Sequence, residues 1–483
     1  MINEFPRVRF APSPTGYLHV GGLRTALYNY LFAKHTNGKF ILRIEDTDRT
    51  RLVEGAVENL IDTLKWAGLN YDEGPFVYGD CGPYIQSQRL DIYNQYVKIL
   101  IENKKAYYCF CSAQRLEKVR EEQQSKKLQP KYDKHCLNLS AEEIELKIKN
   151  GEQYVVRLNV PISEKIIIND IIKGLVEFDS SVIDDQILLK SDGYPTYHLA
   201  NVVDDHLMKI THVIRGEEWL SSTPKHALLY DYFGWERPIF AHLPLLLNID
   251  RKKLSKRQSD VAVEDFRDKG FLNEALVNFV ALLGWTNGDD VEFYNIDELI
   301  NKFSLERVNK SGAVFDLEKL TWLNEEHLRK KTTAEIVKMF KKSYEKSTFT
   351  NTYSDEYFGF VVDAMRERIS FVQDILIKSP FFFETPETYD MEVFHKRWKE
   401  DSSDLLREFN AEIDYVDNPT KEDYEKILHK VAENKNVGVG KIIHPLRLAV
   451  SGIGIGPGLY DILLIIGKNE VKKRITNILQ KFN

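Results

Sequence analysis

The fold is decided near the start of the chain, where residues 7–22 read RVRFAPSPTGYLHVGG. Polar and apolar side chains alternate over residues 7–10, which predicts a strand with one face toward a core. A turn rich in Pro and Gly follows, and apolar residues then recur at helical spacing over residues 23–31. A second, more apolar strand is expected over residues 40–44. A strand, a helix and another strand in this order form a βαβ unit, which implies an α/β fold with a parallel sheet.

The composition is that of a folded protein of several domains. At about 150 residues per domain, 483 residues suggest about three domains. The charged fraction of 29% and the hydrophobic fraction of 43% exclude wholesale disorder, collagen-like repeats and a coiled-coil rod. The net charge of −7 does not decide whether nucleic acid is bound, because a basic face can be balanced elsewhere. Without a long apolar stretch or a signal-peptide core, we expect a cytoplasmic protein with no membrane partner.

The sequence pattern changes twice along the chain. Charged helical stretches and short strands over residues 85–190 indicate an insertion in the sheet domain. Alternation of strand and helix resumes at Val213–Arg215, and the next helix is expected to begin at Thr223-Pro224 and to end near Gly234. From about residue 264 onward amphipathic helices dominate. The last third of the chain is therefore predicted to be helical.

Two separate segments have the chemistry of a nucleotide site. The first, His19-Val20-Gly21-Gly22, stands at the expected start of the first helix. Free N–H groups and the positive end of the helix dipole attract anions there, glycine permits close approach, and His19 adds a donor. A short motif of this kind taken alone is more often only a turn.

The second segment is the basic run Lys253-Leu254-Ser255-Lys256-Arg257. Its cations can neutralise a triphosphate and stabilise charge on departing pyrophosphate. An isolated basic run is more often a solvated loop or a contact for an RNA backbone. We expect both segments to converge on one nucleotide, with His19 and Lys256 bordering a common cavity.

Longer blocks of sequence carry a family resemblance. Together with the two segments above, they resemble the class I aminoacyl-tRNA synthetases and, within them, the glutamyl-tRNA synthetases. The resemblance extends over the whole chain and rests on the blocks Arg9–Gly16, Arg43–Asp48, Tyr194–Asn201, Arg215–Trp219 and Val314–Leu320.

The resemblance implies a particular domain order. A Rossmann-type catalytic domain with a parallel sheet would comprise residues 1–90 and 193–243, split by an α+β insertion at residues 91–192 that grips the tRNA acceptor end. A connecting, stem-contact domain carrying the KLSKR loop would follow at residues 244–325. An all-α anticodon-binding region would occupy residues 326–483.

The resemblance also implies a reaction, that of a glutamate–tRNA ligase. ATP with Mg²⁺ and L-glutamate give glutamyl-adenylate and pyrophosphate, usually only with tRNA bound, and glutamate then passes to the terminal ribose of tRNA(Glu). A non-discriminating enzyme that also charges tRNA(Gln) is an alternative, and a monomer is expected. A glutaminyl enzyme fits the blocks less well, and the shorter relative that modifies a tRNA base lacks the region beyond Leu320. A non-catalytic tRNA-binding protein is expected to lose His19 or the lysines.

By the same resemblance, individual residues receive roles. His19, Lys253 and Lys256 would contact phosphate in the transition state, with Gly21, Gly22 and Ser255 completing the ATP site. Arg9 and Arg215 would bind glutamate, because guanidinium forks bind carboxylates with two hydrogen bonds. The remaining glutamate ligands would be Ala11, Ser13, Glu45, Tyr197 and Asn201, with Glu45 on the α-ammonium group. The alternative is that Arg43, Glu45, Asp46 and Asp48 form only ion pairs.

Three cysteines of the insertion form a candidate metal site. Cys109 and Cys111 stand two apart and Cys136 follows, and closely spaced thiolates can share Zn²⁺. A structural site needs a fourth ligand, for which Tyr132, His135 and water are candidates, since Asn138 replaces the histidine that some relatives use. Three reduced, unliganded thiols are the alternative.

Three further patterns stand outside these sites. The resemblance implies that Arg368 reads the third anticodon base, since arginine can bind a base edge and stack on an unpaired base. The alternative is an ordinary arginine that forms a salt bridge on a helix. The glycine-rich run Gly452–Gly458 does not fit a dinucleotide-binding loop and is predicted to join two helices. Asp204-Asp205-His206 has no metal-ligand spacing, and we assign no metal there.

Overall fold

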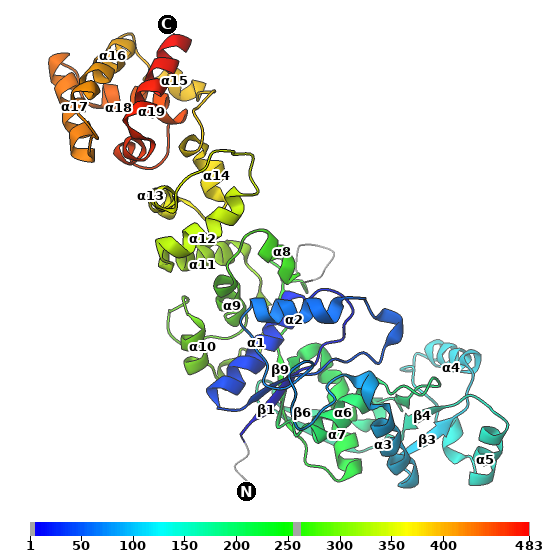
Figure 1. Cartoon of the computed structure of the whole chain (residues 1–483). Coiled ribbons are helices and arrows are strands. Elements are labelled where there is room, and N and C mark those ends of the chain that lie inside the picture. The colour runs from blue at the N-terminus through cyan, green and yellow to red at the C-terminus, as the bar shows by residue number, and fades with distance from the viewer. Residues whose placement is uncertain (1–4, 255–261, 483) are drawn as a thin grey trace. The chain divides into compact units, whose positions relative to one another are not determined.

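The structure, a computed structural model, describes residues 5–254 and 262–482. It divides into two compact units: unit 1 comprises the chain up to Lys269 and Asn273–Leu320, and unit 2 comprises Gly270–Leu272 and the chain from Thr321 (Figure 1). Each unit has its own buried core. No helix in the described residues is long and apolar enough to cross a membrane.

The predicted βαβ unit is present at the start of unit 1. Strand β1 (Arg7–Phe10) pairs in parallel with β2 (Lys39–Leu42), and α1 (Val20–His35) connects them. Val8 and Phe10 are buried as predicted, but Arg9 between them is buried too, so this strand is covered on both faces rather than on one. The inner face of α1 packs on helices α9 (Asn273–Ala281) and α10 (Ile296–Lys302). The Tyr28 hydroxyl ties α1 to this layer through the carbonyl oxygens of Ala281 and Leu283 at 2.9 and 3.0 Å.

A second sheet continues the α/β layer. Its strand order is β6-β5-β9-β8, with β8 (His212–Gly216), β9 (Ile239–Leu243) and β5 (Lys165–Asp170) parallel and β6 (Gly174–Asp179) antiparallel. Strand β8 begins beside β1, because the Thr211 N–H donates to the Arg7 carbonyl at 2.9 Å. The chain between β5 and β9 includes helices α6 (Tyr197–Leu207) and α7 (Thr223–Phe233). Pro224 and Gly234 mark the start and the end of α7.

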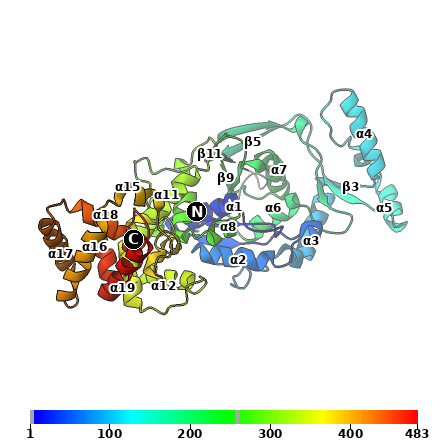
Figure 2. The ribbon, with the colours of Figure 1, turned by 90° about the horizontal axis from the view of Figure 1, so that it is seen from above.

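A smaller antiparallel sheet has the strand order β3-β4-β7. Its strands are Ala106–Cys109, Val155–Leu158 and Ile187–Leu189. Helix α3 (Leu90–Glu102) precedes it, and α4 (Ala113–Ser125) and α5 (Ala141–Lys149) lie between β3 and β4. Figure 2 shows the first strand of this sheet, β3, near helices α4 and α5. Strands β5 and β6 also fall within residues 91–192, and β5 pairs with β9.

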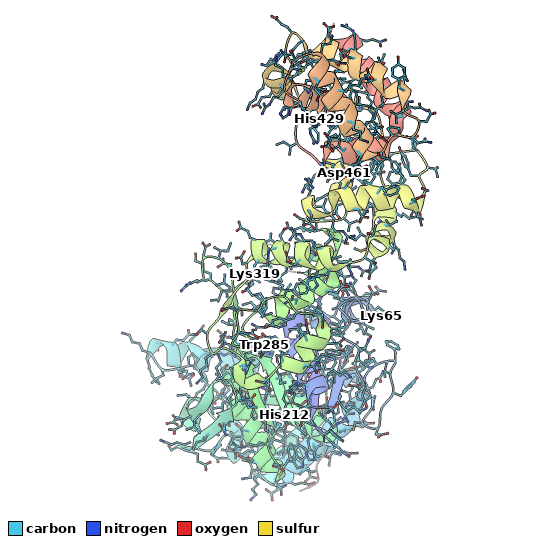
Figure 3. The ribbon with its side chains drawn as sticks, turned by 90° about the vertical axis from the view of Figure 1, so that its left-hand side faces the viewer. Lys65, His212, Trp285, Lys319, His429 and Asp461 are labelled. Atoms are coloured by element: carbon cyan, nitrogen blue, oxygen red, sulfur yellow. The ribbon has the colours of Figure 1, made fainter. Side chains whose placement is uncertain are left out.

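The rest of unit 1 supports the start of α1. Helices α2 (Ala56–Trp66) and α8 (Val263–Asp268) and the short parallel pair β10 (Leu246–Leu247) and β11 (Ala313–Val314) belong to this part. Among the described residues Trp285, labelled in Figure 3, is the largest fully buried side chain. Its ring packs against those of Tyr294 and Phe303.

The described residues of unit 2 contain helices and no strand, as the amphipathic pattern predicts. Helix α11 (Leu317–Lys330) leads into it, and the Gly452–Gly458 run joins α18 to α19, as predicted. Gly452 ends α18 with φ of 75°, a left-handed conformation that glycine adopts without strain. The other helices are α12 (Thr333–Tyr344), α13 (Asp355–Met365), α14 (Asp374–Lys378), α15 (Met391–Arg397), α16 (Ser402–Glu412), α17 (Lys421–Asn434), α18 (Gly440–Ser451) and α19 (Leu459–Lys481).

Candidate active site

A cavity of about 640 Å³ opens at the carboxyl ends of β1, β2 and β8. Its lining comes from the turn after β1, the first residues of α1, the segment that follows β2, and the end of β8 with the short turn after it. The carboxyl ends of parallel strands meet at one edge of a sheet, where α/β proteins commonly bind ligands. The predicted glutamate ligands that line it are Arg9, Ala11, Ser13, Glu45, Tyr197 and Arg215.

His19 is the N-cap residue of α1. Its Nδ1 accepts a hydrogen bond from the Gly21 N–H at 2.9 Å. In the neutral ring the proton must then reside on Nε2, which makes that edge of the ring a donor. His19, Gly21 and Gly22 line the large cavity and also an adjoining one of about 170 Å³. The start of α1 therefore offers backbone and imidazole donors to an anion.

Lys253 lines this smaller cavity together with His19. The Leu254 N–H donates to the Leu246 carbonyl at 2.9 Å, and on the far side of the basic run Ala262 forms a β-bridge with His19. The expected convergence of the two segments is thus observed for Lys253. Ser255 and Lys256, which complete the predicted ATP site, lie outside the described residues.

Arg215 is buried, with 5% of its surface exposed, and its partners are uncharged. Its Nε donates to His242 Nε2 at 3.1 Å, and its Nη2 donates to the Thr223 hydroxyl at 2.9 Å. Its Nη1 contacts the Tyr197 hydroxyl at 3.0 Å and His226 Nδ1 at 3.2 Å. Burial and the Arg215 charge hold the pKa of His226 well below its ordinary value. Among the described residues no carboxylate lies within 4.0 Å of the guanidinium, so its charge is not neutralised.

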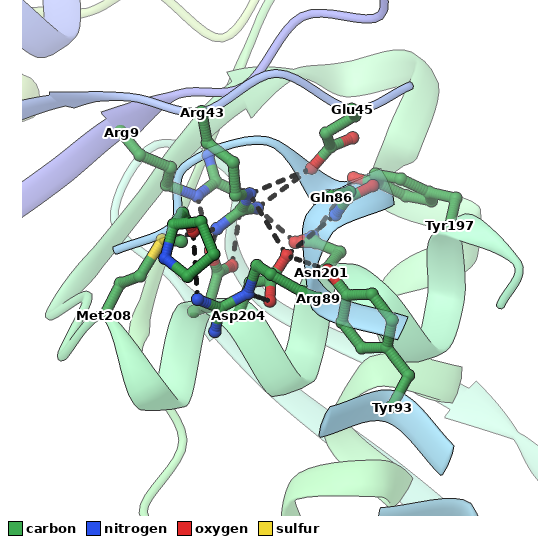
Figure 4. Close-up of polar contacts among 12 residues, drawn as sticks. Arg9, Arg43, Glu45, Gln86, Arg89, Tyr93, Tyr197, Asn201, Asp204 and Met208 are labelled. Carbon is green, nitrogen blue, oxygen red and sulfur yellow. Dashed lines mark hydrogen bonds and ion pairs between the residues drawn. The ribbon is translucent and has the colours of Figure 1, made fainter. Parts of the chain in front are cut away.

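Arg9 has different surroundings, because it belongs to a buried ionic network (Figure 4). Its Nε and Nη2 donate to the two carboxylate oxygens of Asp205 at 3.0 and 3.2 Å. Arg43 donates to the same Asp205 at 2.7 Å and to Glu45 at 2.9 Å. Burial raises the pKa of Asp205, but Arg9 and Arg43 outweigh it and hold that pKa below its usual range. Burial raises the pKa of Glu45 more than Arg43 lowers it.

The network continues to Asp204, one residue before Asp205. Its carboxylate accepts from Arg89 at 2.7 Å and from Gln86 and Tyr93 at 2.9 Å each. Arginine side chains thus contact the carboxylates of both Asp204 and Asp205. The network thus contains three buried arginines and three buried carboxylates, so its formal charges cancel. Buried charges need such partners, because removing them from water is costly. Arg43 and Glu45 form the ion pair that the alternative interpretation expects, but Glu45 also lines the cavity.

Asn201 stands apart from the other predicted ligands. It is 1% exposed and does not line the cavity. It contacts Arg9 Nη2 at 3.4 Å and donates to the Tyr197 hydroxyl at 3.3 Å. The structure therefore places Asn201 behind two residues of the lining.

The sequence interpretation missed the residues that hold Arg215. His226, His242 and Thr223 contact its guanidinium, and Asp170 contacts His242. They come from α7, β9 and β5, so no local motif unites them. The one signal available was an arginine near the end of a buried strand.

The three cysteines of the insertion meet at one point. The Sγ atoms of Cys109, Cys111 and Cys136 lie within 4.8 Å of one another. The Tyr132 hydroxyl lies 3.4 Å from Sγ of both Cys109 and Cys111. A hydrogen bond from Cys136 lowers the pKa of the Cys109 thiol below its ordinary value. Three sulfurs at this spacing fit three of the four ligand positions of a tetrahedral Zn²⁺ site, and the Tyr132 oxygen lies beside them, whereas His135 is exposed and does not join the group.

In unit 2, Arg368 ends the short 3-10 turn Arg366–Arg368 that follows α13, and it lies beside the loop at residues 452–458. Its Nε donates to the Gly456 carbonyl at 3.2 Å. Arg447 contacts the same loop, donating to the Pro457 carbonyl at 2.8 Å. Burial and the Arg368 charge lower the pKa of Arg447. Two cations therefore lie close together in unit 2.

Comparisons with known proteins agree with this arrangement. Residues 6–322 match the family described as tRNA synthetases class I (E and Q), catalytic domain, and residues 324–479 match the anticodon binding domain. The glutamate–tRNA ligase of Chloroherpeton thalassium is 54% identical over 499 positions, which cover 100% of this chain and 99% of that protein. That of Chlorobaculum parvum is 51% identical over 500 positions, with the same coverage.

The chain belongs to the glutamate–tRNA ligase family. Solved structures of this family agree. The glutamate tRNA ligase of Elizabethkingia meningosepticum, determined in complex with its amino acid, superposes with a TM-score of 0.95 at 40% identity and covers 99% of this chain and 100% of its own. The enzyme of Elizabethkingia anophelis gives a TM-score of 0.92 at 39% identity with the same coverage.

The family membership confirms the predicted fold class and reaction class. The chain has a class I synthetase catalytic domain, an anticodon-binding domain and a large helical C-terminal part. It is a glutamate–tRNA ligase family enzyme, and class I synthetases of this kind use ATP with Mg²⁺.

Proposed function

We propose that this chain activates L-glutamate with ATP to glutamyl-adenylate, releases pyrophosphate, and then transfers glutamate to the terminal ribose of tRNA(Glu). The observation that carries the proposal is the buried, unneutralised guanidinium of Arg215 at the wall of the cavity. A substrate with an acidic side chain would supply the missing negative charge. Such a pair forms charge-assisted hydrogen bonds in a site with little water, where they are strong.

Each end of glutamate has a partner in this proposal. Arg215 receives the side-chain carboxylate, with Arg9 beside it. Among the described residues Nη1 of Arg9 has no hydrogen-bond partner, so it remains available to the ligand. Glu45 receives the α-ammonium group. Its Oε1 accepts from Arg43, and its Oε2 has no hydrogen bond among the described residues. Ala11, Ser13 and Tyr197 complete the wall, and Asn201 supports Tyr197 and Arg9 from behind.

The activation step in this proposal needs no nucleophile from the protein. The α-carboxylate of glutamate attacks the α-phosphorus of ATP, and pyrophosphate leaves. His19 donates through Nε2 to phosphate oxygens, and Lys253 stabilises the charge that develops on pyrophosphate, together with Lys256 and Ser255 from outside the described residues. Alignment and fixed charges then account for the catalysis. Mg²⁺ enters with ATP and neutralises part of the triphosphate charge.

The test is glutamate-dependent exchange of labelled pyrophosphate into ATP in the presence of tRNA(Glu). The proposal expects exchange with glutamate and little with glutamine. Absence of exchange with any tRNA, together with tight tRNA binding, would favour a non-catalytic tRNA-binding protein instead.

We also propose that Cys109, Cys111 and Cys136 bind one structural Zn²⁺, with Tyr132 or water as the fourth ligand. The support is the closeness of three sulfurs and a phenol oxygen. Bound zinc would hold the small β3-β4-β7 sheet to the turn that carries Cys136. Metal analysis of the purified chain tests this site.

The tRNA contacts in this proposal follow the domain order. Residues 91–192 would grip the acceptor end, the connecting domain at residues 244–325 would contact the stem, and residues 326–483 would bind the anticodon, with Arg368 as a base reader. A cytoplasmic monomer belongs to the same proposal. Charging of tRNA(Gln) is the second candidate activity, and aminoacylation of purified tRNA(Glu) and tRNA(Gln) side by side distinguishes the two.

A further inference from the structure

The partners of Arg215 differ in kind from those of the three arginines in the neighbouring ionic network. Arg9, Arg43 and Arg89 each have an aspartate or glutamate oxygen at 3.0 Å or less. Arg215 has a phenol, a hydroxyl and two imidazoles. A carboxylate in any of these positions would neutralise the cation before a ligand arrived.

His242 is held on both edges of its ring. On one edge Nδ1 lies 2.6 Å from Asp170 Oδ2. Asp170 also accepts the backbone N–H groups of Ile172 at 2.9 Å, Lys173 at 2.8 Å and His242 itself at 3.1 Å. A carboxylate surrounded by donors is an acceptor, so the Nδ1 edge of His242 carries its proton.

On the other edge His242 Nε2 faces the Nε–H of Arg215 at 3.1 Å. Arginine has donors only, so Nε2 must accept. The hydrogen bonds on the two edges therefore specify a neutral ring with its proton on Nδ1. A protonated ring would set an N–H against the N–H of Arg215. Burial lowers the pKa of His242 below its ordinary value. The charge of Arg215 acts in the same direction, and the hydrogen bond to Asp170 acts against it. The lowered pKa agrees with a neutral ring.

We propose that His242, oriented by Asp170, is a positioning residue that fixes the guanidinium of Arg215 at the cavity wall while leaving its charge available, so that the site accepts a carboxylate and rejects the isosteric amide. The inference rests on the proposed function and extends it to specificity. A neutral acceptor such as His242 Nε2 orients the Arg215 guanidinium as a carboxylate would. Unlike a carboxylate, it does not neutralise the positive charge, which can then pair with the ligand. Glutamine in the same pose would leave a buried cation unpaired, which is the basis of strong discrimination.

Two conservative variants separate this role from simple packing. In His242→Asn the amide nitrogen can replace Nδ1 toward Asp170, but the side chain is too short to reach Arg215. In His242→Gln the amide oxygen can replace Nε2 and accept from Arg215. The matched control is His206→Asn, because the ring of His206 stacks on Trp235 with centroids 3.7 Å apart and does not line the cavity.

The readout is pyrophosphate exchange in the presence of tRNA(Glu), with glutamate, glutamine and ATP varied in turn. We expect His242→Asn to raise the KM for glutamate about tenfold or more, the scale of one lost bond to a charged group, and to lower the preference for glutamate over glutamine. The KM for ATP of His242→Asn should change less than about twofold. His242→Gln should have a KM for glutamate close to that of the unmodified protein, and His206→Asn should resemble the unmodified protein in all three substrates. Equal behaviour of His242→Asn and His242→Gln, or parallel changes for glutamate and ATP, would overturn the inference.

A measurement on the unmodified full chain does not depend on how the variants fold. The ¹⁵N shifts of labelled histidine report the ring tautomer, and loss of one signal in His242→Gln assigns it. We expect a neutral ring protonated at Nδ1, and a proton at Nε2 or a cationic ring at neutral pH would refute the proposal. If the unmodified protein showed no glutamate-dependent exchange, the proposed function would fail and this inference with it. Normal exchange with a wrong tautomer would refute this inference alone.

Discussion

Replacing Arg215 by alanine removes the one cation of the cavity wall that has no acidic partner among the described residues. A guanidinium can give a carboxylate two charge-assisted hydrogen bonds, each with a net value of about 1.5–3 kcal/mol. Loss of both gives about 3–6 kcal/mol, and because 1.4 kcal/mol corresponds to tenfold, kcat/KM for glutamate should fall by roughly 10²–10⁴-fold.

The assay is pyrophosphate exchange with tRNA(Glu) present, with glutamate and ATP varied separately. ATP would bind beside His19 and Lys253, so the KM for ATP should change little. Arg215→Lys is the matched variant, because it keeps the charge and loses the planar guanidinium. Its kcat/KM for glutamate should lie between that of the unmodified protein and that of Arg215→Ala. Thermal melting of each variant controls for folding, since Arg215 is buried. Equal changes in both KM values, or full activity of Arg215→Ala, would refute the assignment.

Three other perturbations test other parts of the molecule. Lys256→Ala should lower kcat for adenylate formation by roughly 10²-fold or more, the scale of one lost oriented charge, and an unchanged kcat would remove Lys256 from the mechanism. Cys136→Ser should reduce zinc measured by mass spectrometry to well below one per chain while Cys81→Ser does not, and equal zinc in both would exclude the cysteine site. Because its arginine partners hold the pKa of Asp205 below the unfolded value of about 3.8 despite burial, its stabilising contribution is present above that pH and is lost as pH falls through the folded-state pKa. Asp205→Asn should therefore weaken the fall in melting temperature between about pH 4 and pH 2, and an unchanged acid limb would contradict the ionic network.

Local patterns predicted much of the fold because they report local physics. Alternation over residues 7–10 and helical spacing after Leu23 gave the βαβ unit, and Pro224 and Gly234 marked the bounds of α7. The pairing of β5 with β9 was not predicted, because these strands are about 70 residues apart and nothing in either one specifies its neighbour.

The candidate site was predicted only where residues lie in recognisable blocks. His19, Arg9 and Arg215 were identified, and each lines the cavity. Asp205 and His242 were not assigned to it, although they hold Arg9 and Arg215. Such supporting contacts depend on tertiary packing, which brings α6 to β1 and β9 to β8, so local sequence spacing does not reveal them.

The most direct test of the account is a crystal structure of the protein with L-glutamate bound. We expect the side-chain carboxylate within hydrogen-bond distance of the Arg215 guanidinium and the α-ammonium group beside Glu45. Glutamate bound with its side chain directed away from Arg215, or an ordered inorganic anion that stays on Arg215 while glutamate binds elsewhere, would contradict the account.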